Sequence, residues 1–187
     1  RYESLKKIIR TGDIEKLKQV KHNSPILNRP ENENLGPLDL AILHGQRDML
    51  EKLISLGADV NAKNKLGFTP VHVAAQKGSV KDLWTLFKYG ASSNNKLNEP
   101  PYPKYPNKSD DATAVLYGLH LTPLHSATYY GDLEKVKALI SAGAQLNTSG
   151  ELGWTPLHIA AFKKHNQVYH ALVDAGAKQL PNKDGDL

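Results

Sequence analysis

The sequence predicts an all-α chain in which five helix–turn–helix repeats stack into a solenoid. Three markers recur in one register. The first is a Thr-Pro-apolar-His phrase around Pro70, Pro123 and Pro156, with a weaker copy at Pro37. The second is a Gly-Ala pair 20 residues after each proline, and the third is a glycine eight residues after the first three prolines. The prolines are 33, 53 and 33 residues apart, so one interval holds 20 extra residues. Self-similarity at such a period is typical of repeat architectures.

Each marker has a place in a helical unit. Pro70 suits the first turn of a helix, where its missing N–H costs nothing, and Thr69 suits the N-cap. Gly78 is expected to end this first helix in a left-handed turn that glycine adopts cheaply. Residues 80–87 carry apolar side chains at helical spacing and predict a second helix, which Gly90 ends in the same way.

The two end repeats depart from this pattern. A step of 33 residues back from Gly45 reaches Gly12, which marks a first repeat whose opening phrase is lost. In the last repeat, Lys164 stands where the inner copies have glycine. We expect a single domain over residues 1–187, with repeats at about 1–33, 34–66, 67–99, 119–152 and 153–187 and a Pro/Tyr-rich insertion at about 99–118.

The phrases at 122–125 and 155–158, with the glycines that follow them, resemble the ankyrin repeat over residues 3–185. The resemblance implies an ankyrin repeat solenoid of helix–turn–helix units joined by β-hairpin fingers, with Asn61 and Asn147 shaping the hairpins. It also implies a binding protein without catalysis. The layout is similar to that of bacterial ankyrin proteins that shield a cell from its own secreted enzymes.

The sequence offers no assembled chemistry. It has no cysteine, which excludes disulfides, thiolate metal sites and a cysteine nucleophile. Neither a phosphate-binding loop nor a catalytic serine or zinc motif is present. His72, His125 and His158 would lie about 10 Å apart in successive layers, too far to share a metal ion bound at about 2 Å. In the family this histidine ties its helix to neighbouring hairpin backbone. Acidic residues of the second helices, such as Asp82, are expected to face solvent. We therefore expect no catalytic residue, metal or cofactor.

The charge and hydropathy patterns narrow the class of partner. The net charge is +5, but Lys and Arg are spread along the chain, which disfavours nucleic acid as the partner. No apolar run has the roughly 18–20 residues of a membrane span. We expect another protein as the partner, with an enzyme as one candidate, and a monomer when unbound. The sequence does not determine the compartment: we expect the cytoplasm or, if a signal peptide is removed before Arg1, the periplasm or secretion.

The resemblance implies that partners meet the concave side, at positions two residues before each proline and six and seven after it. Large apolar or aromatic side chains occupy many of these positions, where solvent exposure alone would favour polar ones. Exposed aromatic residues mark interaction surfaces, although some of them could pack against adjacent hairpins instead. The candidate partner-binding residues there are Phe68, Lys77, Leu121, Tyr129, Tyr130, Trp154, Phe162 and Lys163.

The insertion adds two more candidates, Tyr102 and Tyr105. It holds four prolines between Pro100 and Pro106, which exclude helix and favour extended geometry. We expect it to enlarge one finger and to enter a cleft of a partner enzyme. The alternatives are a tolerated surface insertion, which costs little in loop-closure entropy, and a chain that serves as a general scaffold or, more weakly, binds nucleic acid or an anionic surface.

Overall fold

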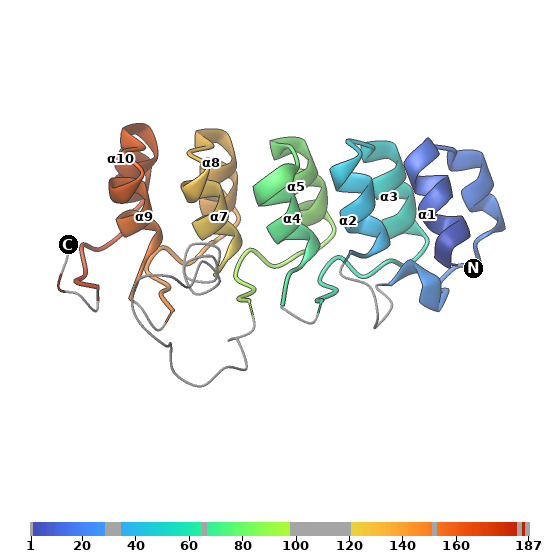
Figure 1. The fold of residues 1–187 in the computed structure, drawn as a ribbon, viewed down its shortest axis with the longest axis horizontal. Helices are drawn as coiled ribbons and strands as arrows, with labels where there is room; N and C mark the ends of the chain where they lie inside the picture. Colours follow the sequence, from blue (N-terminus) through green and yellow to red (C-terminus); the bar gives the residue numbers. More distant parts are fainter. Residues whose placement is uncertain are drawn as a thin grey trace. The chain divides into compact units, whose positions relative to one another are not determined.

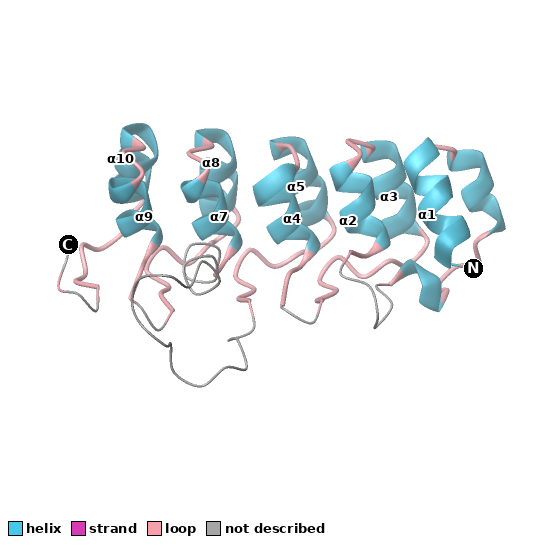
Figure 2. Cartoon of the chain, in the orientation of Figure 1, coloured by secondary structure: helices cyan, strands magenta, loops and turns pink. Residues whose placement is uncertain are grey.

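The computed structural model describes residues 2–28, 35–64, 67–97, 121–150, 153–182 and 185. The chain divides into two compact units, Arg1–Ser92 and Ser93–Leu187. All regular structure in the described residues is helical (Figure 2). The all-α prediction is therefore confirmed for them, whereas the β-hairpin fingers are not confirmed, because the same residues form no strand.

The described residues of the first unit form two helical pairs and an N-terminal repeat of one α-helix and two 3-10 helices (Figure 1). These elements are α1 (Tyr2–Thr11), the 3-10 helices η1 (Ile14–Gln19) and η2 (Pro25–Leu27), α2 (Pro37–Leu43), α3 (Arg47–Ser55), α4 (Pro70–Lys77) and α5 (Val80–Lys88). Helix α2 packs against α1, α3 and α4, and α4 packs against α5. Leu50, Leu53, Leu83 and Leu86 are fully buried, so each second helix supplies an apolar stripe to the core of the unit.

The described residues of the second unit repeat this plan with two helical pairs. These helices are α7 (Pro123–Tyr129), α8 (Leu133–Ser141), α9 (Pro156–Phe162) and α10 (Asn166–Asp174). Helix α7 packs against α8 and α9, and α10 packs against α8 and α9. Leu124, Leu139, Ile159 and Leu172 are fully buried between them. Among the described residues, no helix is long and apolar enough to cross a membrane.

The Thr-Pro-apolar-His phrase starts the first helices as predicted. The Thr69 side chain accepts a hydrogen bond from the backbone N–H of His72, and the Nδ1 of His72 accepts one from the backbone N–H of Thr69 (3.2 Å). Thr155 and His158 form the same reciprocal pair at the start of α9. These side chains are buried, so their hydrogen bonds satisfy backbone N–H groups at the helix start that water cannot reach.

Gly78 corrects one expectation. Gly45, Gly90 and Gly131 take positive φ angles of 65°, 85° and 69°, as expected for helix ends. Gly78 has φ −88° and no left-handed turn, because α4 continues to Lys77. Glycine is needed there for space: a Cβ atom would lie 2.7 Å from the Cγ2 of Ile42 and 2.8 Å from the Cα of Ala74.

Asp82 corrects another expectation. Its side chain is buried, and its Oδ2 accepts hydrogen bonds from the backbone N–H (2.7 Å) and the hydroxyl (2.8 Å) of Ser79. Asp82 therefore caps the start of α5, where a carboxylate also complements the helix dipole. Of the other acidic residues of the second helices, Glu134 and Asp174 are exposed as expected, whereas Glu51 is half-buried.

Asparagine side chains form hydrogen bonds with backbone groups in the described parts of the connections between repeats. Asn28, Asn61, Asn94 and Asn147 share one register, 33, 33 and 53 residues apart. Each Oδ1 accepts from a backbone N–H farther along the chain, donated by Asp59 (3.0 Å), Ser92 (2.8 Å), Gln145 (2.7 Å) and Lys178 (2.8 Å) respectively. The Nδ2 groups of Asn61 and Asn94 donate to the carbonyls of Gly90 (3.3 Å) and Gly143 (3.0 Å).

The end repeats carry local irregularities that the sequence indicated. In the first repeat, the 3-10 helix η1 replaces the second α-helix, and the Asp13 side chain caps it. A hydrogen bond from Lys16 lowers the pKa of the Asp13 carboxyl. In the last repeat, Lys164 has a φ of 57°, the left-handed conformation of Gly45 and Gly131 at the equivalent place.

Candidate protein-binding surface

The second unit brings five of the predicted residues together at the ends of two neighbouring helices. We call this set the aromatic face: Tyr129, Tyr130, Trp154, Phe162 and Lys163. Tyr129 ends α7 and Tyr130 is its C-cap, while Phe162 ends α9 and Lys163 is its C-cap. Trp154 directly precedes Thr155, which caps α9. Because α7 packs against α9, their ends present these side chains side by side.

Perpendicular ring pairs organise the aromatic face. The ring centroids of Tyr129 and Tyr130 lie 5.2 Å apart at 87°, and those of Trp154 and Phe162 lie 5.4 Å apart at 88°. The Nζ of Lys163 lies 4.5 Å from the Tyr129 ring centroid and so links the α9 end to the α7 end. Edge-to-face pairs and a cation over a ring are both favourable geometries. The side chains are thus held in place before any partner arrives.

Two rings of the aromatic face are open to solvent. Phe162 is 66% exposed and Tyr130 is 49% exposed, while Tyr129, Trp154 and Lys163 are half-buried. A largely exposed phenylalanine contributes nothing to the core of the unit. Its exposed apolar area can stabilise a complex, because burying this area against another surface is favourable in free energy.

Two histidines hold the backbone beneath the rings. The Nε2 of His125 lies 3.2 Å from the carbonyl oxygen of Trp154, and the Nε2 of His165 lies 3.0 Å from that of Tyr129. The predicted role of His125 in tying a helix to neighbouring backbone is confirmed. The role of His165 was not predicted. The sequence shows only that His165 and His170 are five residues apart, and not that the His165 ring reaches the Tyr129 carbonyl oxygen.

The remaining candidates lie elsewhere. Leu121 was expected to face solvent, but it is only 8% exposed, and its carbonyl oxygen accepts a hydrogen bond from the backbone N–H of Leu97 (2.9 Å). Phe68 is half-buried in the first unit, with its ring centroid 5.6 Å from that of His72. Lys77 is exposed at the end of α4. Tyr102 and Tyr105 lie outside the described residues.

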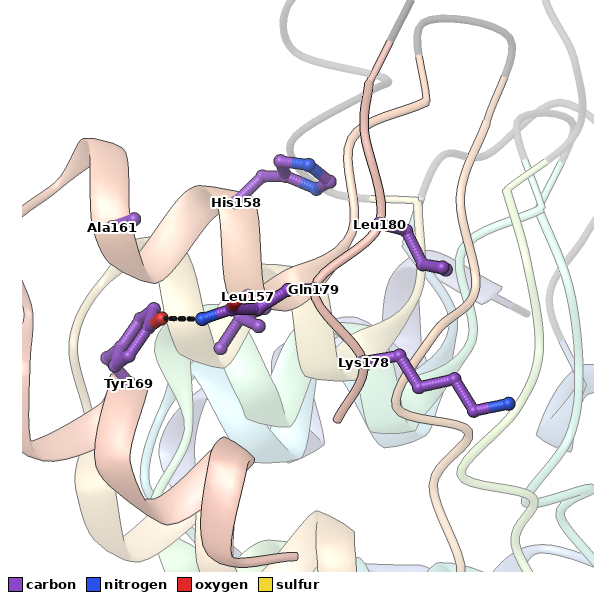
Figure 3. A pocket seen from close by; sticks show the side chains of 7 residues that line it. All are labelled: Leu157, His158, Ala161, Tyr169, Lys178, Gln179 and Leu180. Atoms are coloured by element: carbon purple, nitrogen blue, oxygen red, sulfur yellow. Dashed lines mark hydrogen bonds between the residues drawn. The ribbon is translucent and has the colours of Figure 1, made fainter. Parts of the chain in front are cut away.

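One hollow in the described part of the second unit is small. Its volume is about 90 Å³, and α9, α10 and the segment after α10 line it (Figure 3). Gln179 donates a hydrogen bond to the Tyr169 hydroxyl (2.9 Å) at its edge (Figure 3). Sites for small ligands occupy roughly 300–1,000 Å³, so this hollow does not indicate a substrate pocket. The described residues also contain no group of three or more side chains placed to hold a metal ion.

The geometry is that of a repeat scaffold with an exposed aromatic surface, and comparison with known proteins gives its family. A family model described as "Ankyrin repeats (3 copies)" matches residues 5–97 and 104–183. The chain belongs to the ankyrin repeat family. This membership confirms the resemblance seen in the sequence and is consistent with protein binding.

The curated relatives include proteins with regulatory names. The chain is 40% identical to protein phosphatase 1 regulatory subunit 27 of Homo sapiens over 75 residues, which cover 40% of the chain and 49% of that protein. It is 29% identical to NF-kappa-B inhibitor alpha of Homo sapiens over 134 residues, 72% of the chain and 38% of that protein. Rabankyrin-5 of Homo sapiens is 27% identical over 159 residues, 84% of the chain and 13% of that protein. The chain thus spans about half or less of each relative.

Proposed function

We propose that this ankyrin repeat chain binds a partner enzyme through the aromatic face of its second unit and inhibits that enzyme. The exposure of Phe162 and Tyr130, on rings already fixed by perpendicular contacts, is the observation that supports this most. Interfaces draw most of their energy from a few large aromatic side chains that a partner covers completely. Rings that are ordered beforehand lose little entropy on binding.

A positive charge beside the rings narrows the kind of partner surface that can bind there. The Lys163 ammonium group lies over the Tyr129 ring, at the junction of α7 and α9. A carboxylate of the partner could pair with it while an apolar side chain covers Phe162. The partner surface that fits best is therefore apolar with an acidic residue at its edge.

The inhibitory part of the proposal draws on the relatives and on the insertion. One relative is named a regulatory subunit of a phosphatase and another is named an inhibitor. Tyr102 and Tyr105 belong to a proline-rich segment that the sequence predicts to be extended. In this proposal that segment enters the enzyme's cleft while the aromatic face supplies affinity.

The binding claim is tested with the double variant Phe162→Ala/Tyr130→Ala. Immobilised wild-type chain captures the partner, mass spectrometry identifies it, and calorimetry measures its Kd with each purified variant. We expect a loss of at least about 30-fold in affinity, because the loss of a single hot-spot ring already costs about 2 kcal/mol. Val173→Ala is the matched control, since Val173 is 40% exposed on α10 of the same unit. Unchanged affinity in the double variant would contradict the proposal.

The inhibition claim needs a separate variant, Tyr102→Ala/Tyr105→Ala, and an assay of the partner's activity. We expect this variant to bind the enzyme through the aromatic face but to inhibit it less than the wild type does. Full inhibition by this variant, or by a chain lacking residues 99–112, would exclude the insertion as the blocking segment. A partner that binds with no change in its activity would instead make the chain an adaptor.

A further inference from the structure

Helix α5 of the first unit exposes a second aromatic surface, unrelated to the aromatic face. Trp84 is 48% exposed and Tyr89 is 39% exposed, and Lys81 and Lys88 are exposed beside them. Residues 81, 84 and 88 are three and four apart, so they share one side of the helix. Lys81, Trp84, Lys88 and Tyr89 together form what we call the Trp84 face.

Local contacts order this face. The Trp84 and Phe87 ring centroids lie 6.2 Å apart at 80°. The Nζ of Lys88 lies 5.2 Å from the Tyr89 ring centroid. The indole is therefore supported from one side, and its remaining surface is available to a partner.

The Trp84 face departs from the equivalent surfaces of the other second helices. Polar residues stand in the place of Trp84 in α3, α8 and α10: Glu51, Lys137 and His170. Acidic residues stand in the place of Lys81 in α3 and α8: Asp48 and Glu134. The one acidic residue of α5, Asp82, is buried in its cap and does not offset the lysines. The face is therefore both more aromatic and more positive than repeat architecture requires.

We propose that the Trp84 face binds an acidic, apolar peptide segment of a partner protein. A large apolar side chain of the segment covers Trp84, and two carboxylates pair with Lys81 and Lys88. The two lysines are seven residues apart, about 10 Å along the helix axis. A segment in polyproline II geometry rises about 3.1 Å per residue with three residues per turn, so acidic residues three positions apart lie on one side and match this spacing.

Two other occupants fit the face less well. Helices that lie in a membrane surface bury a long apolar stripe, whereas Leu83 and Leu86 of α5 are buried in the core and leave only two rings outside. A second copy of the face would bring like charges together. The acidic segment is favoured because it complements both the indole and the two ammonium groups.

The chain offers a direct reporter, since its two tryptophans, Trp84 and Trp154, lie one on each surface. The variant Trp154→Phe leaves Trp84 as the only indole. The probe is a twelve-residue peptide with two glutamates three positions apart and a leucine between them, and the control peptide has lysines in place of the glutamates. We expect the acidic peptide to shift Trp84 emission to shorter wavelength and the basic peptide to leave it unchanged.

Charge reversal sharpens the test. In the Trp154→Phe background, Lys81→Glu/Lys88→Glu should lower affinity for the acidic peptide about tenfold and raise affinity for the basic one. Lys7→Glu/Lys21→Glu, which reverses two exposed lysines of the same unit, should leave both affinities unchanged. Circular dichroism of each variant checks that the helices are intact.

Several results would overturn the proposal. These are an unchanged Trp84 emission, an equal response to both peptides, or a response only to vesicles of phosphatidylserine and phosphatidylcholine. The variant Trp84→Gln, which keeps Trp154, separates this proposal from the function proposed above. A peptide-induced change in Trp154 emission of equal size would place the peptide on the aromatic face instead.

Discussion

The two exposed aromatic surfaces of this chain are built by opposite means. The aromatic face of the second unit combines four rings with one lysine, at the ends of the first helices α7 and α9. The Trp84 face of the first unit places one indole between two lysines on the second helix α5. Apolar area dominates the former and charge dominates the latter. The same scaffold therefore presents two surfaces that differ in exposed apolar area and in charge.

The largest effect is expected from Gly131→Ala, which acts directly below the aromatic face. Gly131 has φ 69°, and a Cβ there would lie 2.7 Å from the His165 ring, which contacts the Tyr129 carbonyl. Left-handed strain and the clash together should lower the free energy of unfolding of the second unit by about 2–3 kcal/mol. Urea unfolding followed by Trp154 emission, in a Trp84→Phe background, measures this.

Gly45→Ala is the matched control in the first unit. Gly45 has φ 65°, but a Cβ there would meet nothing within 4 Å. Only the conformational cost remains, so we expect about 1 kcal/mol, followed by Trp84 emission in a Trp154→Phe background. Equal losses for the two variants would show that His165 yields easily and does not hold the aromatic face.

A smaller effect is expected from ionic strength, which should weaken binding at the two surfaces to different degrees. Between 50 and 500 mM NaCl, affinity of the Trp84 face for the acidic peptide should fall roughly fivefold, because exposed ion pairs are screened. Affinity of the aromatic face for its captured partner should change less than about twofold, since apolar burial supplies most of it. Calorimetry at both salt concentrations measures the contrast, and equal salt dependence would contradict it.

The smallest effect concerns the last repeat. Lys164 has the left-handed backbone that Gly131 has at the equivalent place. Lys164→Gly removes the strain of a side chain in this conformation, so we expect the second unit to gain roughly 0.5–1 kcal/mol of stability. Urea unfolding followed by Trp154 emission again reports it. A loss of stability would mean that the lysine side chain makes contacts worth more than its strain.

The repeat register predicted the helices well, because the local chemistry of each phrase determines where a helix starts. Helices α2, α4, α7 and α9 begin at the four marker prolines. The conformation of Gly78 could not be predicted in this way, since it depends on one extra residue in α4 and on the approach of Ile42. The cap formed by Asp82 was readable in principle, because a serine stands three residues before it.

The candidate site was predicted in part. The family resemblance, applied in this register, predicted candidates at the ends of α7 and α9, and these ends lie next to each other because the two helices pack together. It failed for Leu121, whose burial depends on how a connecting segment packs. Trp84 was not among the candidates, because the positions that the resemblance implies lie two residues before each proline and six and seven after it, whereas Trp84 lies on a second helix. Asn28 and Asn94 share the register of Asn61 and Asn147, so the same spacing could have identified them.

The asparagine links have a consequence for synthesis of the chain. Each amide leaves the ribosome before the backbone N–H that it binds, so no link can close until a later part of the chain has been made. After Asn28, 31 more residues must be translated to reach Asp59, and the same number separates Asn61 from Ser92. The separation of Asn94 from Gln145 is 51 residues, because the insertion is translated in between. At about 5–20 residues per second, that link stays open for a few seconds longer than the others during translation.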